Sequence, residues 1–228
     1  MTSTRTVPPS ATTAARHRAP PREQAAFASA DMSVVVLPFV QFCLAAFGAF
    51  TVTSEYGSGM IRGTLASVPR RARLFAGKAV IVGGVSLLTG LILTSAMLGA
   101  VTAIVGDRPA PIAPWPSAAD GVPAALASTA VLMVVGLVGF GVGALLRSAA
   151  GTLVTMTGLL FVLPVVASFL SSPWNVRVGA VLLPNLGVQL AGEANDPVLS
   201  SAGAAIALAA YLVLALGAGG YALIRRDA

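Results

Sequence analysis

Two short stretches contain residue types that could carry out catalysis or bind a nucleotide. Ser58 is flanked by Gly57 and Gly59, an arrangement that resembles a serine nucleophile, which needs a general base to take its proton. Gly77 and Lys78 resemble the last part of a phosphate-binding loop, in which backbone amides hold the phosphates and a following hydroxyl residue binds magnesium.

Neither stretch has the residues that would complete its chemistry. Ala79 replaces the hydroxyl residue of a phosphate-binding loop, and Ala72 stands where its first glycine should be. The long uncharged stretches contain no histidine, lysine or acidic residue, so they offer no general base and no proton relay. The one histidine, His17, lies in a polar segment near the amino end. We therefore expect no enzyme activity, metal or cofactor, which leaves a passive pathway or a machine driven by another subunit.

Composition places the chain in a membrane. Hydrophobic residues make up 56% and charged residues 10% of the 228 residues, and the mean hydropathy is +0.87, which one soluble core could not hide. The formal charge of +6 does not indicate a nucleic-acid partner, because the arginines lie at the ends of apolar runs. The predicted fold class is an all-α polytopic membrane protein embedded in the lipid bilayer.

Five stretches are uncharged and long enough, at about 20 residues, to cross the hydrocarbon core as helices. They are residues 32–54, 79–106, 121–146, 148–170 and 197–224. Together they form a transmembrane domain over residues 32–228, preceded by a proline- and arginine-rich tail, residues 1–31, that we expect to be disordered. Arg147 separates the third and fourth stretches, a connection short enough for an antiparallel hairpin. Gly139 and Gly143 form a GxxxG step that supports helix packing.

The connections differ between the two sides of the membrane. Residues 106–120 hold four prolines and Trp115, which suits an exposed extracytoplasmic loop. In residues 171–196 the apolar middle is too short to span and is interrupted by Pro184, so we expect a re-entrant or interfacial pair of short helices. Arginine and lysine gather in the other connections, which places the carboxyl terminus in the cytoplasm of a multi-pass protein of the cytoplasmic membrane. With an odd number of spans, five, the amino-terminal tail then lies outside with its arginines. This placement conflicts with the rule that arginine and lysine stay on the cytoplasmic side.

The connection from Glu55 to Lys78 is the most basic, with five of the fourteen arginine and lysine residues. Its apolar residues recur at helical spacing up to Pro69, which predicts a short amphipathic helix on the membrane surface. One interpretation is a docking element that receives force from a soluble partner. The other is an ordinary basic loop that only fixes topology, and spacing alone favours this second interpretation.

The same connection resembles the segment after the second span of ABC-2 type transporter permeases. An acidic–aromatic pair, a Gly-x-x-Arg-x-Thr-Leu step, a proline with arginines and a lysine recur in that family in this order. The matching residues here are Glu55, Tyr56, Gly59, Arg62, Thr64, Leu65, Pro69, Arg70, Arg71 and Lys78. A Leu-Leu-Arg between two spans, an outer segment with tryptophan and Leu-Pro-Asn, and a last span ending in Arg-Arg-Asp are similar as well. The resemblance covers residues 32–228.

The resemblance implies the permease subunit of an ABC exporter that moves a hydrophobic or amphipathic substrate across the cytoplasmic membrane. It implies six spans per protomer, a second permease subunit in a homo- or heterodimer, and cytoplasmic ATPase subunits that hydrolyse ATP. In that family the loop after the second span contacts the ATPase. The residues that would couple this chain to the ATPase are Glu55, Tyr56, Met60, Ile61, Arg62, Thr64, Leu65, Arg70 and Arg71.

Two alternatives to a permease stay open. The family begins with a basic amphipathic segment and a first span, whereas this chain begins with a polar tail. A non-transporting five-span scaffold or immunity protein, derived from such a permease, is therefore one alternative. The other is a small-solute channel, which needs a polar stripe along a span, and Thr89, Ser95 and Thr102 are weakly placed for one.

Overall fold

The computed structural model describes residues 37–54, 71–105, 117–192 and 198–226. This part of the chain is almost entirely helical and contains no strand. Five of its helices are long and apolar enough to cross a membrane, so the predicted all-α polytopic fold class is confirmed. The predicted tail and the predicted amphipathic surface helix lie outside the described residues.

The elements follow the predicted order of spans, with short helices between the fourth and fifth spans. In chain order they are the first helix Leu37–Ser54, α4 Arg71–Val105, η1 Ala118–Gly121, α5 Val122–Leu146, α6 Ala149–Thr157, η2 Gly158–Val162, α7 Leu163–Ser168, α8 Trp174–Val181, η3 Leu183–Asn185, α9 Leu186–Ala191 and α10 Ser201–Arg226. The fourth span is built from α6, η2 and α7 in succession.

Helix α4 is longer than the uncharged stretch that predicts it. It begins at Arg71, whereas the uncharged stretch begins at residue 79. Arginine, leucine, alanine and lysine are good helix formers, so the helix continues where the apolar run stops. Its 35 residues rise about 52 Å, against roughly 30 Å for a hydrocarbon core. Part of α4 therefore lies outside the hydrocarbon unless the helix is strongly tilted.

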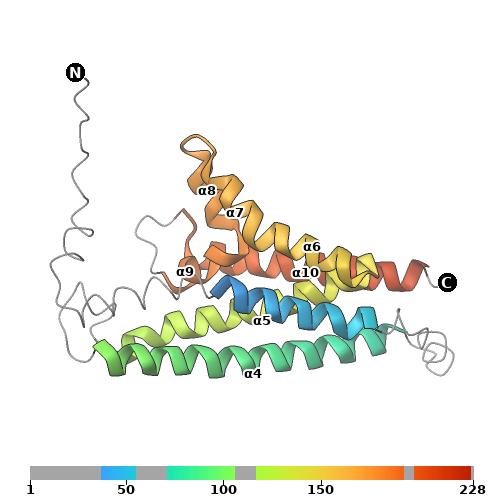
Figure 1. Ribbon diagram of the computed structural model, residues 1–228, viewed down its shortest axis with the longest axis horizontal. Helices are drawn as coiled ribbons and strands as arrows, with labels where there is room; N and C mark the ends of the chain where they lie inside the picture. Colours follow the sequence, from blue (N-terminus) through green and yellow to red (C-terminus); the bar gives the residue numbers. More distant parts are fainter. Residues whose placement is uncertain (1–36, 55–70, 106–116, 193–197, 227–228) are drawn as a thin grey trace, which may run out of the picture.

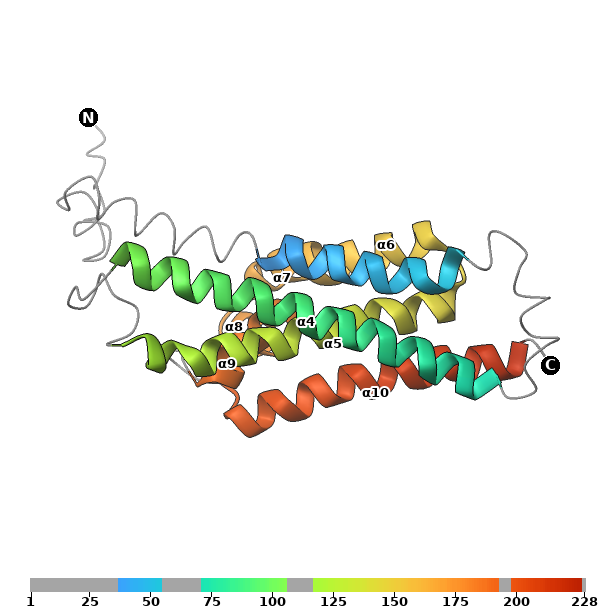
Figure 2. The same ribbon diagram turned by 90° about the horizontal axis from the view of Figure 1, so that it is seen from below.

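Helix α5 is the central helix of the bundle. In its membrane-spanning window 72% of the residues are buried, against 17% to 39% in the other four spans. Figures 1 and 2 show the first helix, α4 and α10 running alongside α5. One buried cluster joins α5 to the first helix, α6, η2, α9 and α10, and another joins it to α4 and the first helix. The core of the protein therefore surrounds α5.

Glycines let the first helix approach α5 closely. A Cβ added to Gly139 would lie 2.6 Å from Ala45 Cα, and one added to Gly143 would lie 3.1 Å from Ala49 Cα. Gly48 of the first helix faces the α5 backbone just as closely. The GxxxG step therefore packs two helices of this chain together, as small residues do between helices in membranes.

Helices α5 and α6 form the predicted hairpin. Arg147 takes a left-handed conformation with φ of 54°, and its N–H donates to Gly143 O at 2.9 Å, which closes the last turn of α5. Ser148 caps α6, because its hydroxyl oxygen accepts from the Gly151 N–H at 3.1 Å. Two residues thus reverse the chain.

The fourth span contains a π-helical turn just before a proline. Pro164 has no N–H, and a proline ring clashes with the carbonyl four residues earlier, here that of Leu160. The turn before it is widened, and the Leu163 N–H donates to Gly158 O, five residues back. This wider turn lets the span continue from α6 into α7.

The connection between the fourth and fifth spans forms two short helices, α8 and α9, separated by the 3₁₀ turn that contains Pro184. Leu183 and Leu186 are fully buried in the cluster that includes Val131 of α5. Trp174, at the start of α8, is 57% exposed. The structure thus divides the predicted pair into α9, which enters the bundle, and α8, which stays at its periphery.

Candidate functional site

The predicted coupling residues from Glu55 to Arg70 lie outside the described residues. Arg71 alone among them falls within the described part, as the first residue of α4. The candidate site is therefore built from the elements that border residues 55–70. These elements are the first helix, whose described part runs to Ser54, and α4.

The two helices that border residues 55–70 are joined near these ends. Lys78 Nζ donates to Thr51 O, in the last turn of the first helix, at 3.5 Å. Residues 55–70 therefore connect two helices that are held together next to the connection.

Arg147 makes a similar contact at the same end of the bundle. Its Nη2 donates to Ala222 O, near the end of α10, at 3.4 Å, which ties α5 to α10. Figure 1 shows the end of the first helix, the start of α4, the start of α6 and the end of α10 together at this end. We call it the basic end, and its basic residues are Arg71, Arg73, Lys78, Arg147, Arg225 and Arg226.

The opposite end differs in charge. In η1 the Asp120 carboxylate accepts from the Ser117 N–H at 3.0 Å and from the Ser117 hydroxyl at 2.8 Å. In α8 the Arg177 guanidinium lies over the Trp174 ring, 5.8 Å from its centroid. An exposed tryptophan is typical of the membrane–water interface. The charge of the described residues is therefore asymmetric between the two ends.

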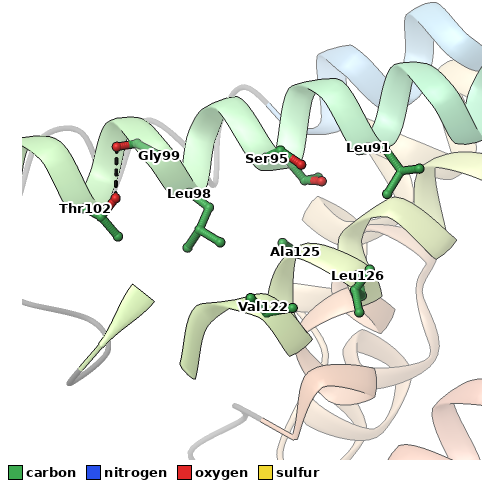
Figure 3. A pocket seen from close by; sticks show the side chains of 9 residues that line it. Leu91, Ser95, Leu98, Gly99, Thr102, Val122, Ala125 and Leu126 are labelled. Atoms are coloured by element: carbon green, nitrogen blue, oxygen red, sulfur yellow. Dashed lines mark hydrogen bonds between the residues drawn. The ribbon is translucent and has the colours of Figure 1, made fainter. Parts of the chain in front are cut away.

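A groove of about 320 Å³ lies between α4 and the beginning of α5, toward the opposite end (Figure 3). We call it the α4–α5 groove. Most of its lining is leucine, valine and alanine, and Gly99 with three hydroxyl residues, Thr94, Ser95 and Thr102, completes it. Of the three residues that the sequence places weakly on a polar stripe for a channel, Ser95 and Thr102 line this groove and Thr89 does not.

A buried hydroxyl pair lies at the inner side of the groove. Thr94 Oγ1 and Thr129 Oγ1 are 2.8 Å apart. The Thr94 hydroxyl is also 2.9 Å from Gly90 O, and the Thr129 hydroxyl is 2.8 Å from Ala125 O. Two hydroxyl protons are thus shared among three contacts, so neither threonine has a donor left for a ligand. The pair holds α4 to α5.

Two buried polar side chains deeper in the bundle have no partner among the described residues. Gln41 of the first helix and Ser86 of α4 are fully buried, and neither amide atom of Gln41 nor Ser86 Oγ makes a hydrogen bond. Ser86 packs against Gly136 of α5. Sequence reasoning missed Gln41, although it is the one amide side chain in the five uncharged stretches. Burial of an amide without a hydrogen-bond partner is energetically unfavourable. Gln41 is therefore expected to destabilise the apolar interface in which it lies.

The fold and the charge distribution define a class, an α-helical polytopic membrane protein. No protein-family model matches the chain. Searches of the curated proteins and of the solved structures find no significant match either. The assignment of a function therefore rests on the residues and contacts described above.

Proposed function

We propose that this chain is the membrane-spanning permease subunit of an ATP-driven exporter of the ABC-2 type. The position of residues 55–70 carries the proposal. This segment, which resembles the coupling loop of such permeases, joins the first helix to α4 at the basic end, where Lys78 holds the two helices together. ATP hydrolysis is assigned to a separate ATPase subunit, because the sequence contains no complete phosphate-binding loop.

The basic end is assigned to the cytoplasm. It carries most of the arginine and lysine of the described residues, whereas the opposite end carries Arg177 and Asp120. Connections rich in arginine and lysine stay on the cytoplasmic side during insertion. The carboxyl terminus and residues 55–70 then face the cytoplasm of a protein in the cytoplasmic membrane, where a soluble ATPase can reach them.

A force applied to residues 55–70 has a direct route into the bundle. The segment is continuous with the first helix and α4, and the Lys78–Thr51 contact links these helices. Both helices pack on α5, the first helix through glycine contacts and α4 through the Thr94–Thr129 pair. Movement of the segment would therefore displace both helices relative to the central helix, and a second permease subunit would complete the path for a hydrophobic or amphipathic substrate.

The test is to purify the chain in mild detergent from membranes in which its candidate ATPase is expressed. We expect an ATPase subunit with a complete phosphate-binding loop to co-purify, and the complex to hydrolyse ATP. The chain alone is expected to show no saturable binding of ATP at micromolar concentration.

Two results would count against the proposal. Saturable ATP binding by the chain alone would contradict the assignment of ATP hydrolysis to a partner. Purification without any ATPase would favour the non-transporting scaffold or immunity protein.

A further inference from the structure

The α4–α5 groove lies at the membrane boundary farthest from the basic end. About 20 helical residues cross the roughly 30 Å of a hydrocarbon core. If the core begins at Lys78, twenty residues of α4 reach its other boundary near Leu98. If it begins at Arg147, twenty residues back along α5 reach that boundary near Ala127. The lining residues of α4 lie on both sides of Leu98, and those of α5 lie next to Ala127. Two independent anchors therefore place the groove where hydrocarbon meets headgroups.

Most polar groups of the groove are already engaged. Thr94 shares its proton with Thr129 and its own backbone, and the Thr102 hydroxyl donates to Gly99 O at 3.0 Å (Figure 3). Ser95 is the remaining hydroxyl of the lining, and it is exposed with no partner among the described residues. The groove therefore offers apolar walls and a single free hydrogen-bond donor, which suits a hydrocarbon chain that carries one acceptor.

We propose that the groove binds one acyl chain of a phospholipid from the leaflet opposite the basic end, with the Ser95 hydroxyl donating to the ester carbonyl of that chain. Phospholipid esters lie between the hydrocarbon and the headgroups, and Ser95 is about 4.5 Å along the helix from Leu98, on the hydrocarbon side. The groove volume of about 320 Å³ is at the lower end of the roughly 300–1,000 Å³ of small-molecule sites, which suits one chain. The site does not depend on the proposed export function.

The exposed apolar surface around the groove favours a lipid as the occupant. Val122 and Leu126 are 43% and 55% exposed on the α5 side, and Ile92 of α4 is 68% exposed nearby in the sequence. Lipid chains cover such a face on membrane-spanning helices. A helix of a second copy is the competing occupant, and it would give crosslinks between two protein chains instead of lipid adducts.

Photo-crosslinking of the full chain in phosphatidylcholine vesicles tests the site. The probe is a phosphatidylcholine with a diazirine on one acyl chain, and mass spectrometry locates the adducts after illumination. We expect adducts at the groove lining. Gly99→Phe, which fills the groove, should lower them about tenfold. Gly84→Phe on the same helix is the matched control, since a Cβ at either glycine meets nothing within 4 Å.

Ser95→Ala tests the hydrogen bond independently of groove filling. It should lower adducts of the ester-linked probe about two- to tenfold. Adducts of an ether-linked probe, which has no carbonyl, should stay as in the unsubstituted chain. This comparison also decides the matter if Gly99→Phe fails to give a monodisperse protein.

Three outcomes would overturn the proposal. Unchanged labelling in Gly99→Phe would exclude the groove as the site. Adducts spread evenly along the exposed face of α4 would show only general lipid contact. Crosslinks between two protein chains at the lining would assign the groove to a second copy.

Discussion

Single glycines determine how closely the helices around α5 approach. Gly139 faces the backbone of Ala45, and Gly219 of α10 faces Gly141 O at a distance that leaves no room for a side chain. Gly217, two residues away on α10, has open space where a Cβ would be. The same residue type therefore has opposite roles at neighbouring positions, because one face of α10 is packed and the other is exposed.

Gly139→Leu is expected to lower the free energy of unfolding by about 1–3 kcal/mol, because a larger side chain would push the first helix away from α5. Gly217→Leu is the matched control and should change stability little, since its side chain would enter open space. Unfolding in mixed micelles measures both variants. Equal stability of the two would contradict the packing described here.

Gln41→Met is expected to raise the free energy of unfolding by about 1–3 kcal/mol, because it removes a buried amide that has no hydrogen-bond partner in the described part of the chain. Gln41→Glu, of similar shape, should destabilise the protein, since it places a charge in the same apolar interface. The same unfolding measurement applies. Destabilisation by Gln41→Met would mean that the amide has a partner in the membrane, such as a bound water.

Helices α4 and α5 form an interface that combines apolar packing with one polar contact. Val82 and Phe140 are fully buried in it near the basic end, and Thr94 and Thr129 bond to each other farther along. Beyond this pair the helices enclose the groove. The threonine pair therefore marks the point where close packing ends.

A double-mutant cycle with Thr94→Val and Thr129→Val is expected to show a coupling energy of about 0.6 kcal/mol, and at most about 1.7 kcal/mol, as for other hydrogen bonds between membrane helices. The control cycle combines Thr94→Val with Thr155→Val, whose exposed hydroxyl bonds to Gly151 O of its own helix. That cycle should show no coupling. The same coupling in both cycles would argue against a contribution from the inter-helix bond.

The span elements were predictable from the sequence, but their roles were not. Uncharged stretches longer than the hydrocarbon core marked all five spans. The start of α4 at Arg71 was missed because an uncharged stretch marks the part of a helix that lies in the hydrocarbon, and α4 continues beyond that part. The π-helical turn is a local response to Pro164 that the uncharged stretch does not reveal. The separate positions of α8 and α9 depend on the burial of Leu183 and Leu186 against α5, and a linear pattern does not contain these contacts.

At the scale of the whole molecule, charge separates the two ends of the bundle. Lys78 and Arg147 bind helix carbonyls at the basic end, and Trp174 with Arg177 lies toward the other end. This asymmetry was visible in the sequence as the placement of arginines. The α4–α5 groove was not, because Thr94 and Ser95 meet Val122 and Leu126 only after α4 and α5 pack together.

Cysteine accessibility tests the orientation of the bundle. In a Cys43→Ser background, a membrane-impermeant maleimide should label Ser117→Cys from the outside, and Ser148→Cys only after permeabilisation, because the basic end is assigned to the cytoplasm. Both serines are exposed, so they form a matched pair. Labelling in the reverse pattern would invert the orientation and remove residues 55–70 from the reach of a cytoplasmic ATPase.

The central claim, that residues 55–70 couple this chain to an ATPase, is tested by Ile61→Ala and Leu65→Ala in the purified complex. If these side chains are buried anchors, each truncation should cost about 1–3 kcal/mol of binding and weaken co-purification of the ATPase about tenfold or more. Substrate-stimulated ATP hydrolysis should fall with it, while membrane insertion stays normal. Val80→Ala, an apolar truncation at a position of α4 that is 74% exposed, should leave both readouts unchanged. Wild-type co-purification and hydrolysis in Ile61→Ala and Leu65→Ala would contradict the claim and return the segment to a loop that only fixes topology.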